Sequence, residues 1–177
     1  MAKTKETKKD DKKAASAAPA PKGSPENVGQ VQGMNLHILA QYLRDASFEN
    51  PNAPQSLRAE LPAPKTDISF HLDARDVQGA KASDLFEVVL KVTINATRDE
   101  KPVFIAEAEY GALVVLKDVP EDKRHPLLLI EVPRLLFPFL RQVIADMTQE
   151  GGFPPLVLNP VDFTRLYIQR FAPKDGK

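Results

Sequence analysis

The stretch LFEVVLKVTINATRDEKPVFIAEAEYGALVVL, residues 85–116, determines the fold of this chain. Polar and apolar side chains alternate from Leu85 to Thr97, which is the pattern of a strand with one buried face. The polar turn RDEKP follows, and a second strand is predicted from Val103 to Leu116, with a bulge or kink at Gly111. Because the connection is short, the two strands are expected to pair antiparallel.

Two more strands are predicted upstream of this hairpin. Ile68, Phe70 and Leu72 alternate with polar residues between Asp67 and Asp73, as a half-buried strand requires. The segment from Val31 to Glu49 is predicted to be a strand, or a short helical entry leading into one, and the breaker-rich residues ASFENPNAP end it. The four segments together predict an antiparallel sheet.

A helix is predicted downstream of the sheet, from about Leu135 or Phe137 to Glu150. Pro138 is tolerated in its first turn, and the two glycines after Glu150 end it. The apolar positions of this helix form one stripe, which is typical of a helix that covers an apolar surface. The stripe consists of Leu136, Phe139, Leu140, Val143, Ile144 and Met147.

A second, short helix is expected after Asn159, which is a natural N-cap, with Pro160 in the first helical position. It contains Phe163, Leu166 and Tyr167. Strands followed by helices indicate an α+β fold, a four-stranded antiparallel sheet with two helices on one face. A body of this size leaves one sheet face or part of the helix stripe uncovered, so we expect a homo-oligomer.

The aromatic residues between Leu135 and Tyr167 allow two interpretations. Glycine and proline breaks stop the two apolar elements from covering each other completely, which would leave a hydrophobic trough for a bound molecule. Apolar residues at helical spacing are also the ordinary content of a protein core. The residues alone leave both interpretations open.

Composition excludes several classes of protein. The chain has 177 residues, no cysteine and three histidines without metal-ligand spacing, so it predicts one domain and neither a disulfide nor a metal site. No stretch is long and apolar enough to span a bilayer and the N-terminus lacks a secretory signal, so we expect a cytoplasmic protein without membrane insertion.

The formal net charge is zero, but it is divided unevenly. Residues 1–30 contain seven lysines and four acidic residues, whereas residues 31–177 contain 17 basic and 20 acidic residues. A mildly acidic body argues against nucleic acid as a partner. We predict a disordered, solvating tail over residues 1–30, with a targeting or membrane-surface role for its lysines as the alternative, then a folded domain over residues 31–171 and a short tail over residues 172–177.

No catalytic motif is present: the sequence lacks a phosphate loop, GxGxxG, GxSxG, HExxH and a nucleophilic cysteine. Glu107 and Glu109 are the best enzyme-like pair, because they share one strand face and their like charges could raise one pKa. The alternative is a solvated, charged sheet face. We expect a protein that is not an enzyme and needs no cofactor.

Four segments resemble the SecB family of protein-export chaperones: YLRDASFENPNAP (42–54), LFEVVLKVTINAT (85–97), VFIAEAEYG (103–111) and LFPFLRQVIADMTQEGGFPPLVLNPVDFTRLY (136–167). The resemblance implies an ATP-independent chaperone of the bacterial cytoplasm. Such a chaperone binds unfolded precursor proteins and delivers them to the SecA motor. It also implies a homotetramer, a dimer of dimers, of subunits with a four-stranded antiparallel sheet and helices on one face.

The resemblance also implies the residues of three sites. Precursor-groove positions would be Phe48, Phe137, Phe153, Leu156, Phe163 and Tyr167; SecA-facing positions would be Asp45, Glu49, Ile105, Glu107 and Glu109; and the oligomer interface would include Leu140, Val143, Ile144 and Met147. The chain ends in FAPKDGK, which is short and basic where many family members have a longer acidic tail. An auxiliary contact of that tail with SecA is therefore in doubt.

Overall fold

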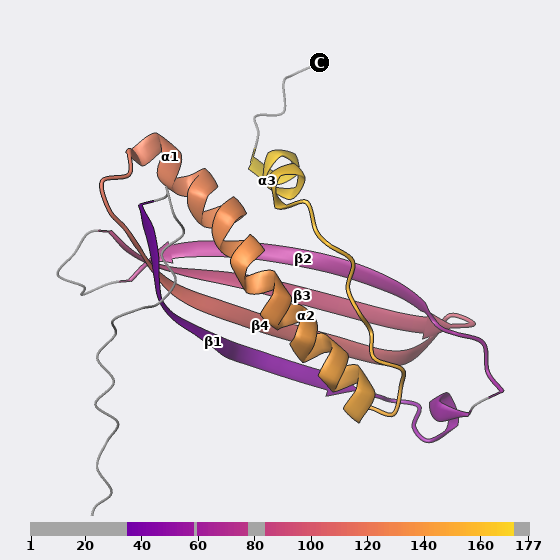
Figure 1. Cartoon of the computed structure of the whole chain (residues 1–177). Coiled ribbons are helices and arrows are strands. Elements are labelled where there is room, and N and C mark those ends of the chain that lie inside the picture. The colour runs from indigo at the N-terminus through magenta and orange to yellow at the C-terminus, as the bar shows by residue number, and fades with distance from the viewer. Residues whose placement is uncertain (1–34, 59, 78–83, 172–177) are drawn as a thin grey trace, which may run out of the picture.

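The computed structural model describes residues 35–58, 60–77 and 84–171. The predicted tails, residues 1–30 and 172–177, lie outside the described residues. The sheet has four antiparallel strands in the order β1-β4-β3-β2 (Figure 1). They are β1 (Leu36–Glu49), β2 (Lys65–Asp76), β3 (Leu85–Arg98) and β4 (Lys101–Leu116). The predicted four-stranded antiparallel sheet is confirmed.

The hairpin of β3 and β4 is tighter than the sequence suggested, because only Asp99 and Glu100 lie between the two strands. Both residues have positive φ angles, 49° and 63°. Two-residue turns with positive φ match the right-handed twist of the paired strands. The inward positions Val88, Leu90, Val92 and Ile94 of β3 have no exposed surface, as the alternation predicts.

Gly111 is not the bulge that the sequence suggested. The register of β1 with β4 skips Leu39 and Arg44, and the register of β3 with β4 shifts between Ala96 and Thr97, while Gly111 pairs regularly with Tyr42 and Val89. A Cβ atom at Gly111 would lie 2.8 Å from Cζ of Tyr42. The glycine therefore gives room to the Tyr42 ring. Strand β1 begins at Leu36, so the helical entry that the sequence allowed between Val31 and Glu49 does not occur within the described residues.

The long helix begins earlier than predicted. Residues 121–131, which lie before the predicted helix, form α1 (Glu121–Pro126) and a π-helical turn (Leu127–Glu131) that connects it to α2 (Val132–Glu150). Two acidic residues in the first turn of α1 favour the positive end of a helix. Tertiary contacts also hold it, since Arg124 forms an ion pair of 2.8 Å with Asp84. Pro138 consequently lies inside α2 rather than in the first turn.

The last helix, α3 (Phe163–Phe171), begins later than predicted. Asp162, not Asn159, caps it: the backbone N–H of Arg165 donates to Oδ1 of Asp162 at 3.0 Å. Leu158 is only 2% exposed, and its burial in the core holds the segment that leads into α3 in place. Asn159 is therefore positioned by tertiary packing rather than by a helix. α2 lies across the sheet and α3 lies beyond it near β2, which confirms helices on one face (Figure 1).

Candidate functional site

An aromatic end cluster, Phe48, Phe104 and Phe153, lies where β1 ends and α2 ends. The ring centroids of Phe48 and Phe104 are 5.4 Å apart, those of Phe104 and Phe153 are 4.9 Å apart, and those of Phe48 and Phe153 are 6.3 Å apart. Phe104 is buried, whereas the other two rings are partly exposed. The cluster therefore holds two partly exposed aromatic rings, Phe48 and Phe153, against the buried ring of Phe104.

Two residues at the end of α2 position this cluster. A Cβ atom at Gly151 would lie 2.3 Å from two carbon atoms of the Phe48 ring, so the missing side chain is what lets the ring approach. Thr148 has no exposed surface. Its Oγ1 donates to the carbonyl oxygen of Ile144 at 2.9 Å and accepts the backbone N–H of Leu156 at 2.9 Å. This hydroxyl fastens the segment after α2 to the helix.

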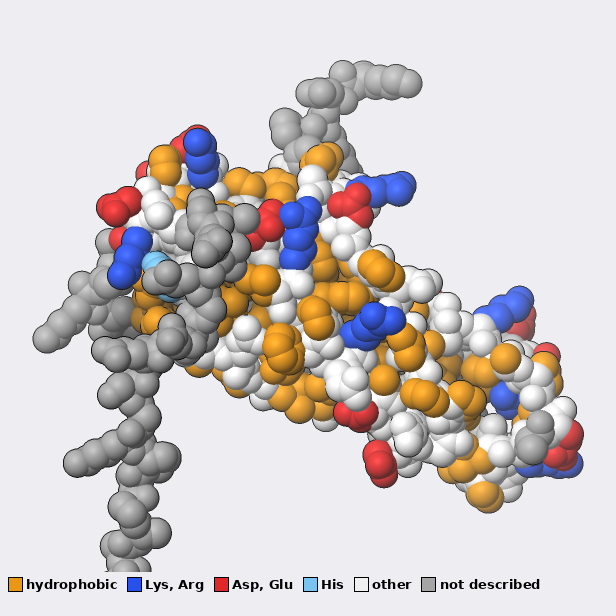
Figure 2. Space-filling view, viewed as in Figure 1, with side chains coloured by type: hydrophobic (Ala, Val, Ile, Leu, Met, Phe, Trp, Pro, Cys, Tyr) orange, Lys and Arg blue, Asp and Glu red, His pale blue; other side chains and the backbone are white. Residues whose placement is uncertain are grey.

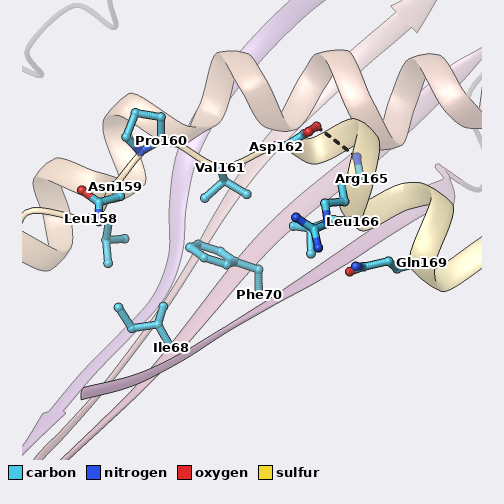
Figure 3. Close-up of a pocket in the computed structure, with 10 residues that line it drawn as sticks. All are labelled: Ile68, Phe70, Leu158, Asn159, Pro160, Val161, Asp162, Arg165, Leu166 and Gln169. Atoms are coloured by element: carbon cyan, nitrogen blue, oxygen red, sulfur yellow. Dashed lines mark hydrogen bonds between the residues drawn. The ribbon is translucent and has the colours of Figure 1, made fainter. Parts of the chain in front are cut away.

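A second apolar feature, the β2–α3 groove, lies between strand β2 and the segment that leads into α3 (Figure 3). Its volume is about 490 Å³. Phe70 from β2 faces Val161 across the groove, and the Asp162–Arg165 hydrogen bond lies at one side. The walls consist of Ile68, Phe70, Leu158, Asn159, Pro160, Val161, Asp162, Arg165, Leu166 and Gln169.

The groove lies at the edge of the sheet that β2 forms. Ile68 is 38% exposed, whereas Leu72, on the same strand face, is 4% exposed. Hydrophobic side chains, drawn in orange, gather over much of this helix-bearing face of the molecule (Figure 2). Residues from distant parts of the chain thus form an apolar surface that is partly accessible to solvent.

The six predicted groove residues do not meet in one trough. Phe48 and Phe153 meet in the aromatic end cluster, and Leu156 follows them, partly buried. Phe137 and Phe163 are 8% and 1% exposed and contact each other, with centroids 5.9 Å apart, so they support the groove from within. Their placement at the groove surface is corrected accordingly.

Tyr167 lies in a third group, where its hydroxyl is 2.9 Å from Nδ1 of His125 and its ring packs against Phe171. Sequence reasoning placed Ile68 and Phe70 only on a strand face and Leu166 only on a helix. The groove that they line was missed, because period-two alternation gives the buried face of a strand but not the position of the strand in the sheet.

The acidic patch, Asp45, Glu49, Ile105, Glu107 and Glu109, lies on the opposite face of the sheet. Asp45 is paired with Glu109, and Glu49 is paired with Ile105. Directly opposed residues in antiparallel strands point to the same side, and Glu107 shares that side through the two-residue period of β4. The structure therefore brings together all five residues that the resemblance assigned to SecA.

Glu107 and Glu109 have basic neighbours from adjacent strands. Nζ of Lys91 lies 3.0 Å from Oε2 of Glu107 and 3.5 Å from Oε1 of Glu109, and Thr93 donates to Oε1 of Glu107 at 3.0 Å. The hydrogen bonds from Lys91 and Thr93 hold the pKa of Glu107 below its usual range. A general acid needs the opposite shift, so the structure gives no support to the enzymatic alternative for this pair.

The residues predicted for the oligomer interface divide into two sets. Leu140 and Ile144 have no exposed surface within the single chain, so they are core residues and cannot contact a partner in this conformation. Val143 and Met147 are partly buried on the flank of α2 that also bears Phe139. Phe139 is 49% exposed and stacks on Tyr110 of β4 with centroids 5.8 Å apart. Leu43, on neighbouring strand β1, is 48% exposed.

Among the described residues there is no cluster of three or more side chains that could hold a metal ion. Within the same part of the chain, no helix has the length and hydrophobicity needed to cross a membrane.

Comparison with known protein sequences identifies the family of this chain. The family model described as "Preprotein translocase subunit SecB" matches residues 29–174. A protein-export protein SecB from Maricaulis maris is 49% identical over 84% of each chain. Its counterpart from Caulobacter sp. is 46% identical over 89% of this chain and 93% of the relative. The chain is thus a protein of the export-chaperone class, and it belongs to the SecB family.

A solved structure has the same fold. A SecB-like chaperone from Mycobacterium tuberculosis, in complex with a ChAD peptide from an antitoxin, matches with a TM-score of 0.59 at 20% identity. The match covers 72% of this chain and 91% of that chain. At this identity the likeness is one of fold.

Proposed function

We propose that this protein is an ATP-independent chaperone of the bacterial cytoplasm that binds unfolded precursor proteins and delivers them to the SecA motor. The observation that carries the proposal is the combination of an open apolar groove with the aromatic end cluster on one face of a sheet. An unfolded chain exposes apolar side chains that a folded protein hides. Several weak apolar contacts along one surface then give tight binding with little dependence on sequence.

The client surface includes the aromatic end cluster, Leu156 and the β2–α3 groove, with Phe137 and Phe163 as its buried support. Tyr167, half-buried on α3, extends it. The mycobacterial SecB-like chaperone was solved with a bound peptide, which supports a polypeptide as the class of ligand.

Matched substitutions test the client surface. Ile68→Ser removes an apolar side chain from the groove wall, whereas Ile168→Ser makes the same change at a 54% exposed position that does not line the groove. Ile68→Ser is expected to weaken the affinity for an unfolded precursor about tenfold, because it removes most of one apolar contact. Ile168→Ser should leave the affinity unchanged. Equal effects of the two variants would contradict the groove assignment.

The acidic patch is the proposed docking surface for SecA. Carboxylates gathered on one face favour fast, salt-sensitive association with a basic partner segment. Glu107→Lys should weaken SecA binding and leave precursor binding intact. Glu150→Lys, at the exposed end of α2, makes the same charge change on the other face and is the control. Unchanged SecA affinity in Glu107→Lys would show that the surface is wrongly assigned.

A second copy of the chain is the proposed partner for the exposed flank of α2 and strand β1, as part of a tetramer built as a dimer of dimers. Phe139, Val143 and Met147 form this flank, next to Leu43. Phe139→Ser should lower the tetramer fraction in sedimentation at a given concentration, with Ile168→Ser as the control. A scaffold that assembles but does not bind unfolded chains is the rival function, and the precursor titration distinguishes the two.

A further inference from the structure

Lys91 flanks the acidic patch on the side of β4 that faces away from β1. It lies on β3 directly opposite Glu109 of β4, and Thr93, its neighbour on the same face, lies opposite Glu107. The Lys91 ammonium bridges the two carboxylates, at 3.0 Å from Glu107 and 3.5 Å from Glu109. One cation of the chain itself therefore occupies the position between the two acids that a basic side chain of a partner would need.

The other carboxylate oxygens of this pair also have partners. Thr93 donates to the second oxygen of Glu107, and Nε of Arg44 lies 3.7 Å from the second oxygen of Glu109. For Asp45 and Glu49 no ion pair is found within the described ranges, residues 35–58, 60–77 and 84–171. The patch thus combines two internally neutralised acids with two acids to which no described residue supplies a cation.

The bridge is exchangeable. The side chains of Lys91, Glu107 and Glu109 are 31%, 33% and 24% exposed, so water and a partner can reach them. Exposed ion pairs of this kind are weak, and the long lysine side chain regains rotamer freedom when it leaves. Thr93 continues to hold Glu107 after Lys91 moves away, because its hydroxyl binds the other oxygen.

We propose that Lys91 is a specificity-determining residue of the docking surface, which a basic side chain of the partner must displace from Glu107 and Glu109. This inference rests on the proposed role of the acidic patch in SecA docking. A partner with one isolated lysine exchanges one cation for another and gains little. A partner with several basic residues, or with an arginine that binds a carboxylate through two N–H groups, gains contacts that Lys91 does not supply. Lys91 thereby selects against weakly basic proteins.

The test measures SecA affinity for Lys91→Gln, Lys123→Gln and Glu107→Gln in the full chain. Glutamine removes the charge at position 91 and keeps an N–H donor within reach of Glu107. An exposed ion pair changes an equilibrium constant by a factor of roughly 2 to 5, so Lys91→Gln should bind SecA about two- to fivefold more tightly at low salt. The gain should disappear at about 0.5 M salt, where screening is strong. Lys123→Gln removes the same charge from exposed helix α1 and should change nothing.

The outcomes separate this inference from the proposed function. If Glu107→Gln weakens SecA binding but Lys91→Gln leaves it equal or weaker, the role of Lys91 is wrong and the docking surface stands. If Lys123→Gln strengthens binding as much as Lys91→Gln, the effect is one of net charge and the role of Lys91 is again wrong. If Glu107→Gln has no effect either, the docking surface itself is wrong, and this inference with it.

Discussion

Gly151→Ala should destabilise the protein, although alanine normally stabilises helical backbone relative to glycine. Gly151 follows the last turn of α2 with φ −72°, a conformation that alanine adopts readily. In open space the substitution would stabilise the fold by about 0.5–1 kcal/mol. Here the new Cβ would lie 2.3 Å from two ring carbons of Phe48, so the ring must move out of the aromatic end cluster.

The displaced ring determines the sign of the effect. Phe48 would lose its contacts with Phe104 and Phe153, and each aromatic pair contributes about 0.5–1.5 kcal/mol beyond the burial of area. Some ring burial is lost as well. After the helix gain is subtracted, the free energy of unfolding should fall by about 1–3 kcal/mol.

A double-mutant cycle measures this directly by urea unfolding at one fixed protein concentration. In a Phe48→Ala background no ring remains to be displaced, so Gly151→Ala should become stabilising by about 0.5–1 kcal/mol. The sign of one substitution thus depends on the presence of one side chain. Equal effects of Gly151→Ala in both backgrounds would refute the close approach of Phe48 as the reason for the glycine.

Three further outcomes follow from the same structure. Thr148→Val should lower the free energy of unfolding by about 1–3 kcal/mol in urea, because it leaves the Leu156 N–H without its acceptor, and Thr148→Ser should cost less. The ordinary pKa of a glutamate is 4.5, and the pKa of Glu107 in the folded state is lower. Glu107 therefore contributes stability above pH 4.5, and this stability is lost as the pH falls through the pKa of the folded state. In Glu107→Gln, the urea midpoint should fall less steeply below pH 4.5. Leu140→Ala should reduce the free energy of unfolding by about 2–5 kcal/mol, as expected for a core leucine, whereas a pure interface role would change only subunit dissociation.

The strands and the acidic patch could be predicted because both depend on local periodicity. A two-residue period places Glu107 and Glu109 on one face, and the resemblance placed Asp45 and Glu49 on the matching positions. The structure adds the pairing of β1 with β4, which brings these residues together. Strand order is not encoded in alternation, so the exposed edge at β2, with Ile68 in the groove wall, could not be derived from the pattern alone.

The helix starts and the aromatic assignments depended on tertiary packing. Asn159 and Asp162 are both good N-cap residues, and the burial of Leu158 next to them determines which one caps α3. Phe137 and Phe48 likewise have the same side chain, and the resemblance assigned both to the precursor groove. Only the crossing of α2 over the sheet buries the first and leaves the second partly exposed.

The most direct test of the central claim compares one polypeptide in its unfolded and folded forms, without nucleotide. Its binding to this protein would be measured as affinity and as suppression of light scattering during refolding. The account predicts strong, stoichiometric capture of the unfolded form and none of the folded form. Equal binding of the two forms, or no binding of either, would contradict a chaperone role and favour an oligomeric scaffold.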